Sequence, residues 1–313
     1  MRCVLIYNPA SGRQRARRLE LLQQVVEVLS ALGHQAELIQ TTGAGSAGLQ
    51  ARKAIEAGAE IIFACGGDGT VHEVMQGLVT ETGESRAALG ILPLGSANAL
   101  ARHLKLSLKP AEAALQQIRG TAVAIPVGKL TCDQQVRYFV VMAGAGPDGA
   151  LVYNLAMGYK SGLGRLAYYV HAARLFATQY FRSFEVAYTE TSGSQASTMQ
   201  AVCAMSVRVS NLGGLFGRLT RRRVSLSEDR LQLLIVRPPA ILSLPLWFVC
   251  GWLHLQRLNP FLRRVEAKEF SCRGESGTGV HVEADGEWIG RLPVQVSLIS
   301  GALRLLIPDL RCC

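Results

Sequence analysis

The first part of the chain alternates short apolar runs with longer amphipathic stretches. The apolar runs predict buried strands at residues 3–7, 36–40, 61–64 and 88–92. Between them, apolar side chains recur at helical spacing, as in residues 19–32, for which Gly33 is the expected stop. Strands that alternate with helices at this short spacing predict a parallel, doubly wound α/β sheet.

The pattern changes near Gly120, beyond which apolar runs are separated mainly by turns. These runs predict further strands at residues 123–130, 136–143, 185–189, 203–209 and 231–236. Residues 280–304 add a strand, an acidic turn and two more strands. We therefore predict an α/β domain over residues 1–122 and a mainly antiparallel β domain over residues 123–313. Whether the last strand returns to the first domain stays open.

The turns that follow the first predicted strands are rich in small and hydroxyl-bearing residues. They lie at residues 8–12, 41–47, 66–70 and 93–98. The carboxyl ends of parallel strands share one edge of a sheet, and doubly wound sheets bind their ligands there. A ligand site is therefore expected where these turns gather.

The turn Gly66-Gly67-Asp68-Gly69-Thr70 joins a buried strand to an amphipathic helix. This arrangement presents backbone N–H groups to a phosphate, and the glycines allow a ligand to approach the backbone closely. Anionic Asp68 would repel a bare phosphate, so its presence indicates a bridging Mg²⁺ or a ligand hydroxyl. The alternative is a tight turn with a solvated Asp68, because a glycine motif alone is weak evidence.

Composition narrows the choice of partner. The chain has 313 residues, 49% of them hydrophobic, and a formal net charge of +10. The hydrophobic content argues against disorder over most of the length. The charge fits a nucleotide, a nucleic acid or an acidic membrane. Aromatic residues make up 6% and do not interleave with basic residues as a stacking platform, so nucleic acid is the least supported partner.

Cysteine usage and the N-terminus bear on the compartment. Eight cysteines occur without a Cys-x-x-Cys pair, so zinc ligation has no support. Cys3 and Cys65 lie in predicted strands as small hydrophobic side chains, which favours a reducing cytosol. The Cys312-Cys313 pair is compatible with lipidation, although two unmodified thiols are the simpler interpretation. The N-terminal segment lacks the length and the cleavage site of a signal peptide.

The chain resembles the diacylglycerol and sphingosine kinase family of lipid kinases. GGDGT is shared with NAD kinases and phosphofructokinases, but its continuation through His72, Glu73 and Val74 is similar to the lipid-kinase pattern. Further turns resemble family motifs: Asn8-Pro9-Ala10-Ser11-Gly12, the turn at Thr41, and Gly95-Ser96-Ala97-Asn98. The resemblance implies a nucleotide-binding first domain and a lipid-substrate second domain.

What the resemblance implies is ATP-dependent phosphorylation of a hydroxyl of a membrane lipid, diacylglycerol-like or sphingoid. The implied cofactors are ATP and Mg²⁺. The implied nucleotide-binding residues are Asn8, Pro9, Ser11, Gly12, Thr41, Gly66, Gly67, Asp68, Gly69, Thr70, Glu73, Gly95, Ser96 and Asn98.

Some positions depart from the family pattern. Ala99 and Gly128 stand where an Asp is common. In the segment 227–231, Glu228 keeps an acidic position as a candidate metal ligand, while Arg230 replaces a Leu. These departures keep two alternatives open. The first is a catalytically impaired lipid- or nucleotide-binding protein of the same fold, and the second is an NAD kinase-like phosphotransferase.

The second domain supplies the candidate base. Asp285-Gly286-Glu287 resembles the family's D-G-E, and Asp-Gly is also a strong hairpin signal. Phosphoryl transfer needs a base near the acceptor hydroxyl. We predict Glu287 in that role, because its longer side chain reaches farther from a turn. Asp285 would orient Mg²⁺ or the nucleotide, and Asp68 completes the predicted catalytic set. Segments 138–148 and 160–168 also resemble family segments. The alternative interpretations are that Asp148 is a helix N-cap and that Lys160 is a surface charge.

Two stretches suggest a membrane surface. Residues 211–223 end in a dense basic run, which suits anionic lipid. Residues 240–255 are the most apolar segment, too short to span a bilayer, and fit either an interfacial helix or an ordinary core helix. We predict a cytoplasmic protein, peripheral at the inner face of the membrane, with a lipid substrate and no nucleic acid. A homodimer stays open.

Overall fold

The computed structural model describes residues 1–9, 17–81, 85–156, 181–191, 193, 195–209, 225–253, 255, 258–275 and 279–309. The chain forms two compact units. The first combines Met1–Val127, Leu226–Glu228 and Ile299–Cys313, and the second combines Gly128–Ser225 and Asp229–Leu298. Strands β5 (Thr121–Cys132) and β15 (Val294–Ile307) contribute residues to both units. The first division falls at Val127, inside β5 and close to the predicted boundary at residue 122.

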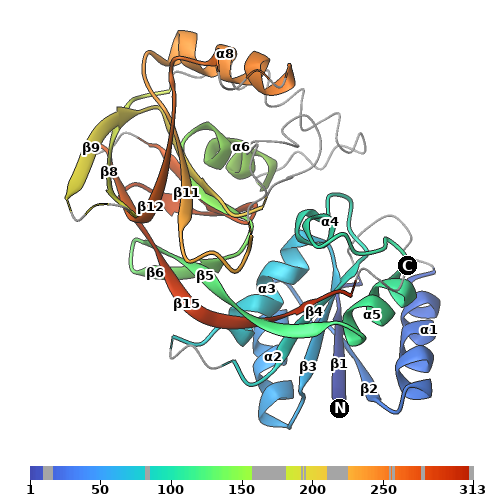
Figure 1. Ribbon diagram of the computed structural model, residues 1–313. Helices are drawn as coiled ribbons and strands as arrows, with labels where there is room; N and C mark the ends of the chain where they lie inside the picture. Colours follow the sequence, from blue (N-terminus) through green and yellow to red (C-terminus); the bar gives the residue numbers. More distant parts are fainter. Residues whose placement is uncertain are drawn as a thin grey trace. The chain divides into compact units, whose positions relative to one another are not determined.

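The first unit is built on a parallel sheet (Figure 1). Its strands are β1 (Arg2–Tyr7), β2 (Gln35–Gln40), β3 (Ile61–Gly66) and β4 (Ala88–Pro93), in the order β4-β3-β1-β2. The C-terminal part of β15 pairs in parallel with β4, on the side away from β3. β1, β3 and β4 are buried along almost their whole length, as expected for strands covered on both faces.

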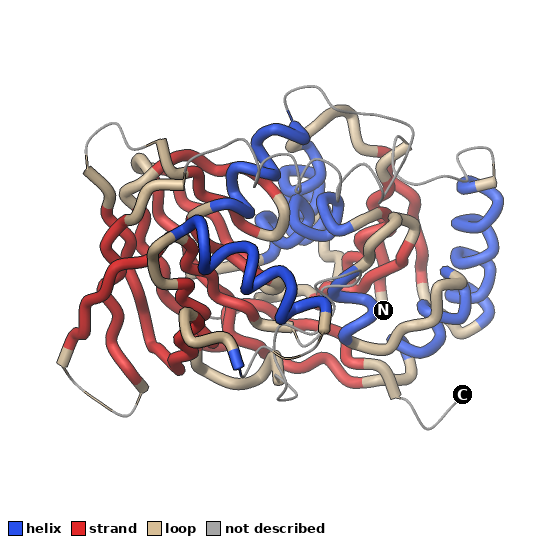
Figure 2. The backbone as a smooth tube through the Cα atoms, turned by 90° about the horizontal axis from the view of Figure 1, so that it is seen from above, coloured by secondary structure: helices blue, strands red, loops and turns tan. Residues whose placement is uncertain are grey.

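Helices cover both faces of this sheet. They are α1 (Arg18–Ala31), α2 (Ser46–Glu56), α3 (Asp68–Leu78), α4 (Ala99–His103) and α5 (Pro110–Ile118). α1 packs beside α5 and α2 beside α3, on opposite sides of the strands (Figures 1 and 2). α2 and α3 cross closely at two glycines: a Cβ on Gly77 would lie 2.2 Å from the carbonyl oxygen of Gly48.

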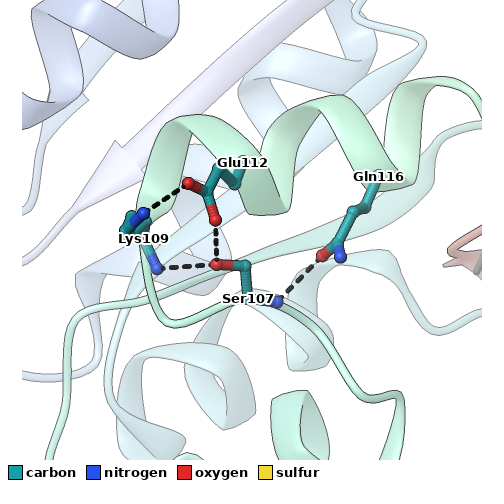
Figure 3. A network of polar contacts seen from close by, with 4 residues as sticks. All are labelled: Ser107, Lys109, Glu112 and Gln116. Carbon is teal, nitrogen blue, oxygen red and sulfur yellow. Dashed lines mark hydrogen bonds and ion pairs between the residues drawn. The ribbon is translucent and has the colours of Figure 1, made fainter. Parts of the chain in front are cut away.

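Polar side chains fix α5 against its neighbours. The Ser107 hydroxyl donates to Glu112 Oε2 at 2.7 Å, Lys109 Nζ pairs with Glu112 Oε1 at 2.7 Å, and the Ser107 N–H donates to Gln116 Oε1 at 2.8 Å (Figure 3). Gln117 is fully buried and exchanges two 2.8 Å hydrogen bonds with the backbone of Ile91 in β4. This amide pair holds the helix on the sheet.

The second unit is mainly antiparallel. Its remaining strands are β6 (Gln135–Phe139), β7 (Met142–Ala145), β8 (Phe184–Glu190), β9 (Ala196–Ala201), β10 (Cys203–Val207), β11 (Leu231–Val236), β12 (Leu262–Arg273), β13 (His281–Ala284) and β14 (Glu287–Arg291). The main order is β14-β13-β7-β10-β11-β12, with β8 and β9 beyond β12. Helix α6 (Pro147–Ala156) contacts β13 and β14. Helix α8 (Ala240–Trp252) packs through Leu244 and Trp247 on the outer side of β10 and β11.

These features confirm the predicted fold class, an α/β domain followed by a mainly antiparallel one. The short helix α4 and the strands β9 and β12 were not predicted. The predicted strand 136–143 is wrong as a single strand, because the chain bends at Val140 and Val141 between β6 and β7. Among the described residues, none of the helices has the length and apolar character needed to cross a membrane.

Several predicted features lie outside the described residues. They are Ser11 and Gly12 of the first turn, Lys160 with segment 160–168, the basic run within 211–223, and Cys312-Cys313.

Candidate nucleotide-binding turns and catalytic hairpin

The polar turns of the first unit meet at the carboxyl edge of its sheet. Beyond the strand ends, the chain keeps its pairing: the N–H of Thr41 donates to Tyr7 O at 2.9 Å, and that of Leu94 donates to Gly66 O at 2.9 Å. The N–H of Asn8 donates to Cys65 O at 3.4 Å. The turns after β1, β2, β3 and β4 are therefore neighbours, as their position after parallel strands predicts.

The turn after β3 and the turn after β4 touch through two glycines. A Cβ on Gly95 would lie 2.3 Å from the Cα of Gly67 and 2.8 Å from Asn98 Oδ1. No other residue fits at Gly95 unless the two turns separate. The closeness leaves a smooth backbone surface at the start of α3, the kind of surface that a phosphate chain can approach.

Asp68 ties these two turns together. Its Oδ1 accepts a hydrogen bond of 2.6 Å from the backbone N–H of Ala99, the first residue of α4. The side chain is half-buried rather than solvated. One oxygen of the predicted catalytic carboxylate thus has a structural partner 31 residues away.

Asn98 shapes the second turn. Its backbone is left-handed, with φ of 50°, and the residue is 6% exposed. Its side chain accepts the N–H of Gly95 at 3.1 Å and donates to the Gly95 carbonyl at 2.8 Å. Asparagine suits this place, because it tolerates φ above zero and can close a turn on itself. Ser96, next to it, is exposed.

Arg18 supports the first turn and was missed as a site residue. Arginine side chains are mostly exposed to solvent. Arg18 is instead only 4% exposed, and its guanidinium donates to the carbonyl of Asn8 at 2.9 Å and to that of Pro9. The buried arginine therefore stabilises the turn through its carbonyl groups. No pattern in the sequence distinguishes Arg18 from its basic neighbours.

The remaining predicted residues of this edge include structural ones. Glu73 Oε2 accepts the N–H of Ala47 at 3.4 Å, in the first turn of α2. Thr41 and Thr70 are 8% and 5% exposed. A Cβ on Gly66 would lie 2.3 Å from the Thr70 hydroxyl, so Gly66 makes room for that threonine. Gly69 is exposed at the tip of the turn.

In the second unit, the Asp285-Gly286 turn joins β13 to β14. Ala284 pairs with Glu287, so the turn has two residues, both with positive φ (49° and 82°). This is the hairpin that Asp-Gly predicts. The irregularity in pairing lies between Val282 and Glu283 rather than at the turn.

The carboxylate of Asp285 binds the backbone of a neighbouring bend. Its Oδ2 accepts the N–H of Val140 at 3.0 Å, and its Oδ1 accepts those of Val141 and Met142 at 2.8 and 3.0 Å. The Asp285 N–H donates to Met142 O at 2.8 Å. These bonds explain the break between β6 and β7, since three N–H groups turn toward one side chain. They favour a positioning role for Asp285.

Glu287 begins β14 and is half-buried. The next residue, Trp288, donates from Nε1 to His281 Nδ1 at 3.0 Å, and the His281 ring stacks on Tyr153 of α6 with centroids 4.5 Å apart. Burial and the nearby charge of Arg291 lower the pKa of His281, so this ring remains neutral as an acceptor. This aromatic cluster holds the β13–β14 hairpin against α6, and Glu287 lies on that hairpin.

A buried acid pair lies beneath this hairpin. Glu283 is 1% exposed, and its Oε2 accepts the N–H of Gly286 at 2.9 Å. Burial raises the pKa of Glu283 well above its ordinary value, and the nearby Asp148 carboxyl raises it further. Burial likewise raises the pKa of Asp148, in the first turn of α6, to about 6. Both carboxyls therefore keep their protons to a higher pH than exposed carboxyls do, and Asp148 is more than the helix cap that its position suggests.

We expect this acid pair to make the folded state less stable as pH rises. A carboxyl whose pKa is raised by folding contributes most below its unfolded pKa, and for Asp148 that contribution is lost between pH 3.8 and about 6. Each pKa unit corresponds to about 1.4 kcal/mol. Glu283→Gln removes one ionisation and keeps an oxygen for the N–H of Gly286. Urea unfolding should show this variant gaining stability relative to wild type as pH rises toward neutrality.

The matched control is Glu185→Gln, on an exposed face of β8. Glu185→Gln removes the same carboxylate charge without changing Glu283 or Asp148, so its free energy of unfolding should follow that of wild type across the pH series. If Glu283→Gln follows wild type as closely as Glu185→Gln does, Glu283 is not held protonated in the fold.

The positions that depart from the family pattern have structural explanations in two cases. A Cβ on Gly128 would lie 2.2 Å from the ring of Phe139, its partner across β5 and β6, so Gly128 is a packing position. Arg230 pairs with Glu266 at 2.8 Å. At Ala99 the acidic side chain is absent, but the backbone N–H still binds Asp68.

No metal centre is evident in the described part of the chain. There, no group of three or more His, Cys, Asp or Glu side chains is arranged to hold a metal ion. Glu228 as a metal ligand therefore stays a prediction.

The chain is similar to known kinases. Residues 2–130 match the family model of the diacylglycerol kinase catalytic domain. The diacylglycerol kinase of Bacillus subtilis is 33% identical over 188 residues, which are 60% of this chain and 59% of that protein. That of Staphylococcus saprophyticus is 26% identical over 292 residues, which are 93% of this chain and 90% of that protein. Over the matched stretch, the chain thus spans little more than half the length of the Bacillus subtilis relative.

The fold is also known. A putative diacylglycerol kinase from Bacillus anthracis aligns over 100% of this chain and 96% of its own, with 24% identity and a TM-score of 0.77. A second Bacillus anthracis diacylglycerol kinase structure aligns with a TM-score of 0.71 and 21% identity, over 100% of this chain and 98% of its own. At these identities the likeness shows the fold alone. Residues 2–130, where the joined turns lie, are thus similar to the diacylglycerol kinase catalytic domain.

Proposed function

We propose that the protein is an ATP-dependent lipid kinase that phosphorylates a hydroxyl of a membrane lipid, with a diacylglycerol-like acceptor as the first candidate. The observation that carries the proposal is the joining of the two glycine turns. Gly67 and Gly95 touch, and Asp68 binds the N–H of Ala99. These turns lie within the residues that match the kinase family model.

ATP fits the first unit because glycine residues without side chains lie at the start of α3, where the N–H groups of a first helical turn can bind a phosphate. Residues of the turns at Asn8, Thr41, Gly66 to Thr70 and Gly95 to Asn98 would hold it. ATP would supply the phosphoryl group, and Mg²⁺ would spread the negative charge of the transferring phosphate. Asp68 would contact the metal or a ligand hydroxyl from these turns.

The acceptor chemistry belongs to the hairpin of the second unit. Glu287 would accept the hydroxyl proton as transfer proceeds, because an alcohol with a pKa far above neutrality loses its proton late. Asp285 would hold the hairpin and the bend at Val140 in register. The catalytically impaired alternative keeps the same fold and predicts ATP binding without transfer.

A protein with this substrate works at a membrane surface. The formal charge of +10 suits an anionic leaflet. We place the protein in the cytoplasm, peripheral to the inner face of the membrane.

The test is transfer of labelled phosphate from ATP across a panel of acceptors: diacylglycerol, monoacylglycerol, a sphingoid base, ceramide and NAD. We expect a labelled lipid product, with diacylglycerol as the preferred acceptor. Label in NAD alone would identify an NAD kinase-like enzyme. ATP binding without any labelled product would identify the impaired binding protein.

A further inference from the structure

Helix α8 is apolar on every side. Its sequence, AILSLPLWFVCGW, contains Ser243 as its only polar residue, and Ser243 is fully buried. Leu244, Trp247 and Cys250 share the buried side and are 2%, 5% and 7% exposed. A helix that is hydrophobic all round is normally buried all round in a water-soluble protein. α8 is buried on one side only.

The opposite side of α8 carries large exposed hydrophobic side chains, and the chain continues in the same way after the helix. We call this set the α8 outer surface: Ile241, Leu242, Val249, Leu253, Leu255 and Leu258, which are 82%, 58%, 44%, 52%, 45% and 72% exposed. Among the described residues, these six are half of the twelve large hydrophobic side chains that are exposed. Exposed hydrophobic residues that gather instead of scattering mark an interaction site.

The charges around this surface favour an anionic partner. From Arg237 to Val265 the sequence has four arginines and neither Asp nor Glu. Arg237, Arg263 and Arg264 are exposed. Arg264 pairs across strands with Leu234, which packs under α8, so Arg264 lies on the α8 side of the sheet. Basic residues beside an apolar helix face are the combination that binds anionic lipid surfaces.

A second copy of the chain is a poorer occupant. A symmetric dimer places the same patch of both subunits face to face. Two α8 outer surfaces would then bring their flanking arginines together with no acidic residue between 237 and 265 to offset them. A lipid bilayer offers apolar chains to the helix and anionic headgroups to the arginines at once.

We propose that the α8 outer surface inserts into the headgroup region of an anionic lipid bilayer, with Arg264 at the headgroups. This surface belongs to the unit that also carries Glu287. The proposal rests on the proposed lipid kinase function, which gives the protein a reason to bind a bilayer. The binding itself can be tested without catalysis.

The main test is sedimentation with phosphatidylcholine vesicles that contain phosphatidylglycerol, without nucleotide, at low and at high salt. The variant is Ile241→Glu with Leu242→Glu. Its control is Leu49→Glu with Leu108→Glu, which adds the same charge at exposed positions of the first unit. Burying one aliphatic side chain changes a partition constant by about tenfold or more. We expect the α8 variant to bind roughly 100-fold more weakly than the control.

Arg264→Glu supplies an independent variant on β12, and Arg263→Glu, which faces the other side of the sheet, is its matched control. The Arg264 variant should bind vesicles more weakly than its control at low salt, while the salt-resistant part carried by the apolar side chains remains. Equal binding of the α8 variant and its control would overturn the proposal. The proposal would also be overturned if light scattering showed that wild type is a dimer and the α8 variant a monomer while the two bind vesicles equally.

A kinase assay separates this proposal from the proposed function. With diacylglycerol in vesicles the α8 variant should lose activity, and with a short-chain diacylglycerol dissolved as monomers it should keep the activity of the control. Loss of both activities to the same extent would contradict a docking role. If wild type has neither activity, the lipid kinase function fails, and the vesicle binding still decides the role of α8.

Discussion

Replacing Glu287 by Gln is expected to reduce turnover by about 10²–10⁴-fold, the usual range for loss of a general base. Affinity for ATP should change little, because Glu287 lies on the β13–β14 hairpin rather than on the turns of the first unit. Stability should also change little, since the side chain is half-buried and Gln has the same shape. Turnover, ATP binding and thermal unfolding on the purified variant check all three expectations.

Asp285→Asn is the informative companion. The wild-type carboxylate accepts three N–H groups, from Val140, Val141 and Met142. An amide offers one oxygen and turns an NH₂ group toward those donors, so the variant should lose about 1–3 kcal/mol of unfolding free energy. If Asp285→Asn folds as stably as wild type but is inactive at saturating Mg·ATP, and Glu287→Gln turns over normally, then Asp285 is the base.

The fold could be predicted mainly where burial is simple. β1, β3 and β4 are apolar runs because both faces of the sheet are covered, and their boundaries differ from the expected ones by one or two residues. β12 was missed for a physical reason. Its buried side chains Val265 and Ala267 are followed by Phe270 and Cys272, and a register shift between Ala267 and Glu269 reverses the alternation. A bulge of this kind hides a strand from any period-two pattern.

The sequence predicts which residue types stand at the strand ends of the site, but not which residues their side chains contact. The glycine and Asp-Gly motifs name the turns, since their backbone demands are local. The partners of Asp68 and Asp285 lie far along the chain, at Ala99 and at Val140 to Met142. Arg18 and Glu283 escaped notice because burial changes what a charged residue does, and burial is a property of the assembled fold.

Replacing Asp68 is expected to have the largest effect in the first unit, and two substitutions separate its possible roles. Asp68→Ala removes both the charge and the acceptor of the 2.6 Å bond from the N–H of Ala99. Loss of a side chain that caps a backbone N–H at a helix start costs about 0.5–2 kcal/mol. We expect no measurable phosphoryl transfer and a modest loss of thermal stability, because the turns after β3 and β4 are no longer joined.

Asp68→Asn keeps an oxygen for the N–H of Ala99 and removes only the charge. If the charge of Asp68 contacts Mg²⁺, this variant should unfold like wild type yet lose most of its activity, and added Mg²⁺ should recover part of it. If Asp68 binds a ligand hydroxyl, the amide oxygen can replace it, and activity should survive at ordinary Mg²⁺. The two outcomes are read from one Mg²⁺ titration of turnover. Wild-type activity in Asp68→Ala itself would remove this residue from the site, because neither the tie to α4 nor the charge would then be needed.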